Sequence, residues 1–135
     1  MLGMYVVLEN AVQMVCDYPA AYEGQPGFEF IQAIPTTWDE TKIIDASIDE
    51  FIITARRKSN DWYIGSINNN EQKNITIDLN FLAEGNYTAT LFTDAKDAAT
   101  NPNDLIKETH TFSKKDKIDL HLEAGGGMVM SLIKQ

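Results

Sequence analysis

From residue 41 onward, hydrophobic and polar residues alternate in short runs that are separated by glycine and asparagine. Alternation with a period of two is typical of strands that bury one face and expose the other. The runs recur about every 10 to 12 residues, which is typical of an antiparallel sandwich. The sequence therefore predicts a mainly β fold, an antiparallel β-sandwich with strands at Lys42–Asp45, Glu50–Arg57, Asp61–Asn68, Asn74–Leu79, Tyr87–Thr93, Ile106–Phe112, Ile118–Leu122 and Met128–Ile133.

Residues 50–69 carry the clearest pattern, two alternating runs joined by a short polar turn at Lys58–Asp61. This arrangement predicts a central β-hairpin. On each strand the apolar residues share one face, which is expected to point into the core; they are Phe51, Ile53, Ala55, Trp62 and Ile64.

The segment Leu2–Tyr18 has a different pattern, in which the few polar residues fall on one narrow stripe at helical spacing. We predict a helix that is apolar over most of its surface. Such a helix is normally buried inside a larger protein, which suggests a missing neighbour, although it could also pack in the core of a small α+β domain. Pro19 ends the predicted helix, and Ala20–Thr37 follows as an irregular connection with one possible helical turn at Ile31–Ala33.

Composition narrows the choice of partners. The chain has 135 residues, of which 44% are hydrophobic, and this suits a globular domain with a core. A net charge of −9 argues against nucleic acid, since proteins that bind phosphates gather lysine and arginine on one face. No apolar run approaches the length of roughly 20 residues that a membrane span needs, and no signal peptide opens the chain. The single Cys16 excludes an internal disulfide bond.

Candidate chemistry is sparse. The adjacent acid pairs Asp39/Glu40 and Asp49/Glu50 fit surface turns better than glycoside hydrolysis, because neighbours on a strand point to opposite faces. One arginine of the pair Arg56 and Arg57 must lie on the covered side of its strand. A buried arginine usually pairs with a carboxylate, so Asp39 or Glu40 is the expected partner.

Other polar groups also fail to form a recognisable site. His110 and His121 lie on separate predicted strands without a third ligand at metal spacing. The oxygen-rich stretch from Asp94 to Asp104 does not match the calcium loop of EF-hands, so calcium there is only a weak alternative. The sequence thus predicts no catalytic, cofactor-binding or metal-binding residue.

Five stretches, in this order, resemble the carboxyl-terminal end of glycoside hydrolase family 97 enzymes. They are YVVLENAVQMVCDYP at 5–19, IPTTWDET at 34–41, TARRKSNDWYIGSINN at 54–69, LNFLAEGNYTATLF at 79–92 and AGGGMVMSL at 124–132. The resemblance covers nearly the whole chain. It implies the end of a catalytic (β/α)8 barrel over residues 1–40, as its last helix and an interdomain connection, and a carboxyl-terminal β-sandwich associated with oligomerisation over 41–135.

The resemblance also implies what the longer protein does. Family 97 enzymes hydrolyse α-glucosides or α-galactosides and use calcium, and a bacterial periplasm is the expected location. Their catalytic carboxylates and calcium ligands have no counterpart here, so this chain alone should be inactive and hold no cofactor. Its expected partners are the parent barrel and a second copy, bound through the N-terminal helix, the sandwich or both.

The residues Trp38, Asp39, Glu40, Arg56, Arg57 and Trp62 are expected to have structural roles. We expect Trp38 to be largely buried and one of the two acids to be hydrogen-bonded, since burying an unpaired charge is costly. An alternative from another functional class is a carbohydrate-binding module, in which Trp38, Trp62 and Tyr63 form a stacking platform for sugars.

Overall fold

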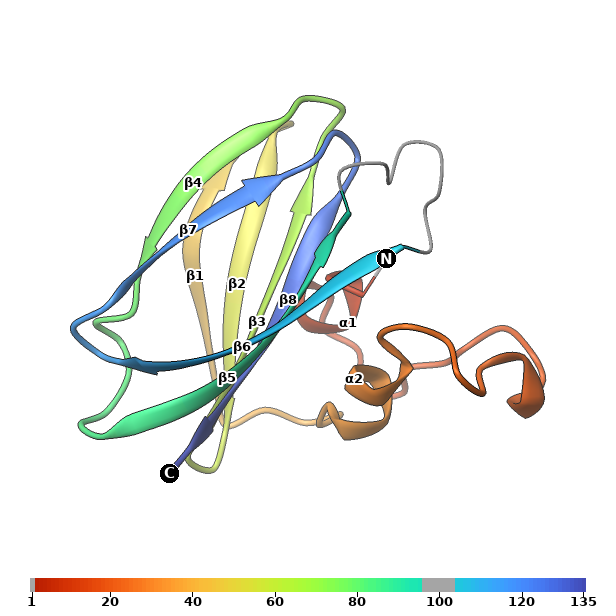
Figure 1. The fold of residues 1–135 in the computed structure, drawn as a ribbon, viewed down its shortest axis with the longest axis horizontal. Coiled ribbons are helices and arrows are strands. Elements are labelled where there is room, and N and C mark those ends of the chain that lie inside the picture. Colours follow the sequence, from red (N-terminus) through yellow and green to blue (C-terminus); the bar gives the residue numbers. More distant parts are fainter. Residues whose placement is uncertain (1, 96–103) are drawn as a thin grey trace.

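The computed structural model describes residues 2–95 and 104–135, which form two antiparallel β-sheets preceded by an irregular N-terminal region (Figure 1). The larger sheet has the strand order β1-β2-β3-β8-β5-β6, and the smaller one pairs β4 with β7. The strands are β1 (Glu40–Ser47), β2 (Phe51–Lys58), β3 (Asp61–Asn68), β4 (Lys73–Asp78), β5 (Asn86–Asp94), β6 (Leu105–Ser113), β7 (Lys117–Leu122) and β8 (Gly127–Lys134). The predicted sandwich and all eight predicted strands are confirmed.

The predicted central hairpin is the pair β2–β3, in regular register from Phe51↔Asn68 to Lys58↔Asp61. Its loop therefore consists of residues 59 and 60, and Ser59 adopts a positive φ of 54°. Two-residue hairpin loops favour such left-handed conformations because they match the twist of the strands. The hairpin places alternate side chains of β2 and β3 on opposite faces of the larger sheet.

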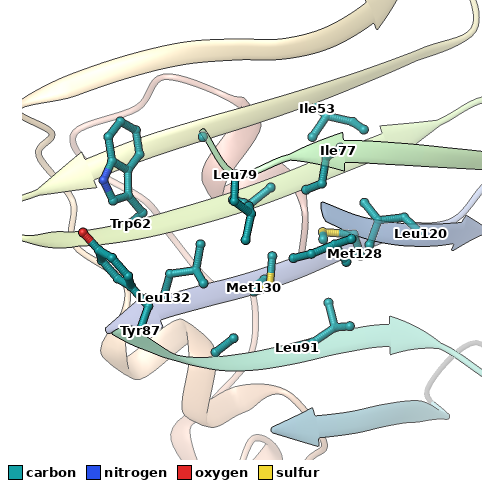
Figure 2. Close-up of a cluster of buried hydrophobic side chains, with 14 of the residues drawn as sticks. Ile53, Trp62, Ile77, Leu79, Tyr87, Leu91, Leu120, Met128, Met130 and Leu132 are labelled. Atoms are coloured by element: carbon teal, nitrogen blue, oxygen red, sulfur yellow. The ribbon is translucent and has the colours of Figure 1, made fainter. Parts of the chain in front are cut away.

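The main core lies between the two sheets (Figure 2). It includes the hairpin residues Ile53, Ala55, Trp62 and Ile64, which are at most 3% exposed. The smaller sheet contributes alternate residues of β4 and β7, which gives β7 a strictly alternating burial pattern. The sequence prediction of core-facing and solvent-facing positions is confirmed for these strands. Outside the hairpin, the core residues that are at most 2% exposed are Ile77, Leu79, Tyr87, Ala89, Leu122, Met128, Met130 and Leu132.

The N-terminal region differs from the prediction. A helix over Leu2–Tyr18 is wrong, since only α1 (Met4–Val7) is α-helical there. It is followed by an irregular stretch with bends, the 3₁₀ turn η1 (Pro19–Ala21) and α2 (Phe28–Ala33). The predicted helical turn at Ile31–Ala33 is the end of α2. Among the described residues, no helix combines the length and apolar character that crossing a bilayer requires.

A helix over the whole segment would place apolar side chains around most of its circumference, whereas the sheet can cover one side of it. Residues 9–12 and 14–20 instead lie exposed. Helix formation in short segments depends on packing an apolar face, which these residues do not do here.

Candidate interaction surface

The N-terminal region covers the face of the larger sheet that points away from β4 and β7. Here a second apolar cluster forms from Val6, Phe30, Ile34, Tyr63, Phe92 and Val129, with Leu2, Tyr5 and Trp38 packed against it. The ring of Phe30, on α2, lies edge-on to Tyr63 and Phe92, at centroid distances of 6.5 and 6.1 Å. The connection between the two predicted domains is therefore held by aromatic contacts to β3 and β5.

Close contact between α1 and β3 depends on two glycines. A Cβ atom at Gly65 would lie 2.6 Å from Val6 Cβ and 2.9 Å from the Gly3 carbonyl oxygen. A Cβ atom at Gly3 would lie 2.1 Å from the Ser66 carbonyl oxygen. The helix therefore packs directly on the backbone of the central hairpin, which only residues without a side chain allow.

Arg56 links α1 to the larger sheet by hydrogen bonds. Its side chain is buried, and its Nε and Nη2 atoms donate hydrogen bonds to the carbonyl oxygens of Val6 (2.6 Å) and Val7 (3.1 Å). These are the last two residues of α1, whose carbonyl groups have no partner within the helix. Nη1 donates to Thr41 Oγ1 (3.2 Å), and the guanidinium lies 5.9 Å from the Trp38 ring centroid. A cation at a helix C-terminus is favourable in itself.

The expectation that the covered arginine pairs with a carboxylate is wrong for Arg56. The acids instead meet Arg57, on the other face of β2: Arg57 Nε lies 3.0 Å from Glu40 Oε2 and Nη1 lies 4.0 Å from Asp39 Oδ2. Carbonyl oxygens, a hydroxyl and an aromatic face surround the buried guanidinium. These partners could not be predicted from the sequence, because every residue has a main-chain carbonyl group and its use as an acceptor leaves no residue pattern.

Both acids of the Asp39/Glu40 pair are held ionised. The Ser59 backbone N–H donates to Asp39 Oδ2 (2.7 Å), and with the nearby Lys58 and Arg57 it lowers the pKa of Asp39. Hydrogen bonds from Lys42 and Arg57 lower the pKa of Glu40. A carboxylate with a lowered pKa is a poor proton donor, so neither group is suited to act as a general acid.

The three aromatic residues considered for sugar stacking do not form a platform. Trp62 lies in the main core and Tyr63 on the opposite face of β3, and both are buried, at 3% and 7% exposure. Trp38 has intermediate exposure and packs against the second apolar cluster, where it meets Tyr63 edge-on at a centroid distance of 5.4 Å with an angle of 61° between the rings. Stacking on a sugar needs exposed rings in one plane, so the structure contradicts the carbohydrate-binding alternative.

The remaining candidate residues are dispersed. Glu50 pairs with Lys73 (3.0 Å) beside the turn at Asp49. His121 contacts Asn74 and Glu123, while His110 contacts Glu108 on the same strand. In residues 2–95 and 104–135, no three histidine, cysteine or acidic side chains come together as metal ligands. Most of the acidic loop considered for calcium, residues 96–103, lies outside the described residues.

The apolar strip is the most distinctive surface of the N-terminal region. We use this name for its exposed apolar side chains, Met4, Leu8, Val12, Met14, Val15 and Tyr18. Val12, Met14 and Tyr18 are 71%, 76% and 68% exposed, and a cleft of about 690 Å³ lies between part of the strip, α2 and the ends of β5 and β8. A run of exposed apolar residues beside an apolar cleft is typical of a surface that another protein element covers.

Comparison with known proteins identifies the family. Residues 37–133 match the family model described as "Glycosyl-hydrolase 97 C-terminal, oligomerisation". The chain is 39% identical to a retaining α-galactosidase from Bacteroides thetaiotaomicron over 132 residues, which are 97% of this chain and 20% of the relative. It is 24% identical to a probable retaining α-galactosidase from Streptomyces bingchenggensis over 127 residues, which are 93% of this chain and 19% of the relative.

A solved structure agrees over almost the entire chain. It is a glycoside hydrolase family 97 enzyme from Pseudoalteromonas sp. in complex with acarbose, with a TM-score of 0.93 and 35% identity over 99% of this chain and 22% of that one. The match thus includes the N-terminal region as well as the sandwich. The chain spans about a fifth of the length of the relatives that it matches. This chain belongs to glycoside hydrolase family 97, and its residues 37–133 correspond to the carboxyl-terminal domain of that family.

Proposed function

We propose that this chain is the non-catalytic carboxyl-terminal part of a family 97 α-glycosidase. In this proposal, residues 1–40 lead from the catalytic barrel to the sandwich, and the sandwich packs on the barrel and contributes to contacts between subunits. The single observation that carries the proposal is the apolar strip, which is exposed although the region around it is anchored on the sheet. An anchored segment with an exposed apolar surface is suited to bind a second folded unit.

The rest of the longer protein would supply the chemistry. The names of the two relatives support hydrolysis of α-galactosides by the longer protein, and we propose α-glucosides as the alternative substrates. We further propose a calcium-dependent parent enzyme located in a bacterial periplasm. Within the described residues the acid pairs are engaged in ion pairs or turns, which supports a structural rather than a catalytic role for them.

Cys16 allows a direct test of barrel packing, since it is exposed and lies between Val15 and Tyr18 of the apolar strip in the sequence. We expect a thiol reagent to modify Cys16 rapidly in the isolated chain and much more slowly in the longer protein that includes the barrel. An Ile48→Cys variant in a Cys16→Ser background provides the matched control, because position 48 is 92% exposed in the turn that follows β1. Equal rates for Cys16 in the two proteins would refute packing of the barrel on the strip.

A further inference from the structure

Strand β6 forms one edge of the larger sheet, and most of its residues are exposed to solvent. It pairs with β5 over nine residues without a register shift, from Asn86↔Ser113 to Asp94↔Leu105. Six consecutive residues, 106–111, are exposed, so both faces of the strand are open to solvent along most of its length. A long, regular and exposed edge strand is a template for pairing with another strand.

The backbone groups on the outer side of β6 can be identified from one hydrogen bond at its start. The Ala95 N–H donates to the Asp104 carbonyl oxygen (3.2 Å), which makes these two residues a hydrogen-bonded pair. Because such pairs alternate along an antiparallel ladder, Ile106, Glu108, His110 and Phe112 direct their backbone groups toward β5. The alternate residues Leu105, Lys107, Thr109 and Thr111 direct theirs outward. No described residue makes a backbone hydrogen bond with Lys107, Thr109 or Thr111 on that side.

The opposite edge of the sheet is different. Strand β1 contains a β-bulge, where its register with β2 shifts between Ile43 and Asp45. Bulges interrupt the regular row of backbone groups and are one of the ways in which proteins protect a sheet edge from pairing. Of the two edges of the larger sheet, β6 is therefore the one suited to accept a further strand.

The sequence of β6 is complementary to itself when two copies run antiparallel about Thr109. That register places Ile106 opposite Phe112, and Glu108 opposite His110. Both are non-hydrogen-bonded pairs, in which facing side chains approach most closely. The first is apolar, and the second joins a carboxylate to an imidazole, so both are favourable cross-strand pairs. Lys107 falls opposite Thr111, which keeps the two lysines apart.

We propose that the β6 edge is the site at which a second copy of this chain binds, by antiparallel pairing about a two-fold axis at Thr109. Two larger sheets then join into one continuous sheet across the axis. Thr109 of each copy exchanges both backbone hydrogen bonds with its counterpart, as a symmetric interface requires. This inference rests on the proposed role in subunit contacts and specifies the surface that performs it.

The first test removes the central backbone donor. Thr109→Pro deletes an N–H group that faces away from β5, a position where an edge strand tolerates proline. The matched control is Thr109→Val, which keeps the N–H and the β-branched shape. In sedimentation equilibrium across a concentration series, we expect the proline variant to raise the dimer Kd by about tenfold or more and the valine variant to leave it nearly unchanged. Equal dimer Kd values for the two folded variants would overturn the proposal.

The second test exchanges charges and does not depend on proline. Glu108→Lys places a lysine opposite His110 of the other copy, and His110→Glu places two acids opposite each other. Each variant alone should weaken the dimer, and the double variant should restore it. Thermal unfolding of each variant reports the loss of the contact between Glu108 and His110 within one copy, where Glu108 Oε2 and His110 Nε2 are 3.0 Å apart. Failure of the double variant to recover association would count against the register about Thr109.

A third set of variants separates this inference from the proposed function. Val12→Ser and Met14→Gln make the apolar strip polar without touching β6. If the unmodified chain forms dimers, and the dimers are weakened by these two variants but not by the β6 variants, the β6 inference fails while a role in subunit contacts stands. If the unmodified chain is monomeric at every concentration, both fail.

Discussion

Replacing Arg56 by methionine tests how the N-terminal region is attached to the sandwich. Methionine fills much of the same volume but removes the guanidinium, and with it the hydrogen bonds to the Val6 and Val7 carbonyl oxygens and to Thr41. Val6 is fully buried, so water cannot easily replace its lost partner. The variant should therefore be destabilised even though the arginine has no carboxylate to pair with.

The expected magnitude follows from these contacts. Each hydrogen bond from a charged donor contributes about 1.5–3 kcal/mol, and a buried acceptor left unpaired costs about 1–3 kcal/mol. Methionine also avoids the desolvation of a buried guanidinium, which offsets part of the loss. We expect Arg56→Met to lower the free energy of unfolding by about 2–4 kcal/mol.

Urea unfolding measured by tryptophan fluorescence provides the assay. The chain has two tryptophans, Trp38 beside Arg56 and Trp62 in the main core. If the N-terminal region detaches before the sandwich unfolds, the emission of Trp38 should shift to the red at urea concentrations below the main transition. A Trp62→Phe background isolates this signal, because Trp38 is then the only tryptophan. Arg57→Met is the matched control, since Arg57 forms partly exposed ion pairs that contribute little. Equal losses for the two variants would refute the role assigned to Arg56.

The roles of Gly65, of the acids with lowered pKa values and of the acid pair Asp39/Glu40 can each be tested separately. Gly65→Ala should lower stability by about 1–3 kcal/mol, because its Cβ would lie 2.6 Å from Val6 Cβ. Gly65 does not adopt a positive φ, so this loss comes from packing rather than backbone strain, and a variant as stable as the unmodified chain in urea unfolding would contradict the packing argument. The pKa values of Asp39, Glu40 and Asp116 are lowered in the folded chain by hydrogen bonds and nearby cations, so these groups contribute stability at neutral pH that should be lost as pH falls below about 4. In urea unfolding midpoints measured at a series of pH values, Asp116→Asn should show a smaller decrease at low pH than the unmodified chain. An identical decrease in the two proteins would be inconsistent with a contribution from Asp116. The isolated chain should not hydrolyse aryl α-glucosides or α-galactosides, with or without calcium, and turnover that disappears on changing Asp39 or Glu40 would place an active site here after all.

The strands could be predicted from the sequence because their alternation follows directly from burial on one face. Ile75, Ile77 and the alternate residues Ile118, Leu120 and Leu122 show this pattern locally, without reference to the rest of the fold. The two sheets and the order of their strands did not follow from that pattern, since pairing joins residues distant in sequence.

The N-terminal region could not be predicted in the same way. Its apolar composition fits a helix, but whether the helix forms depends on what covers it. The anchoring contacts also lack a local signal: Gly65 appears as an ordinary strand glycine, and the partners of Arg56 are backbone carbonyl groups some 50 residues away in sequence. A candidate site built from main-chain acceptors becomes visible only in three dimensions.

The place of β8 between β3 and β5 has a consequence for synthesis of the protein on the ribosome. Among the described strands, β8 is the last in sequence, and it alone joins β1-β2-β3 to β5-β6 in the larger sheet. Neither group of strands can complete this sheet until residues 127–134 have left the exit tunnel, so the larger sheet can close only after its other five strands have been synthesised. The long-range pairing of β8 with β3 should also make that last step slow. Nascent chains that stop just short of β8 would expose both groups of strands to chaperones and proteases.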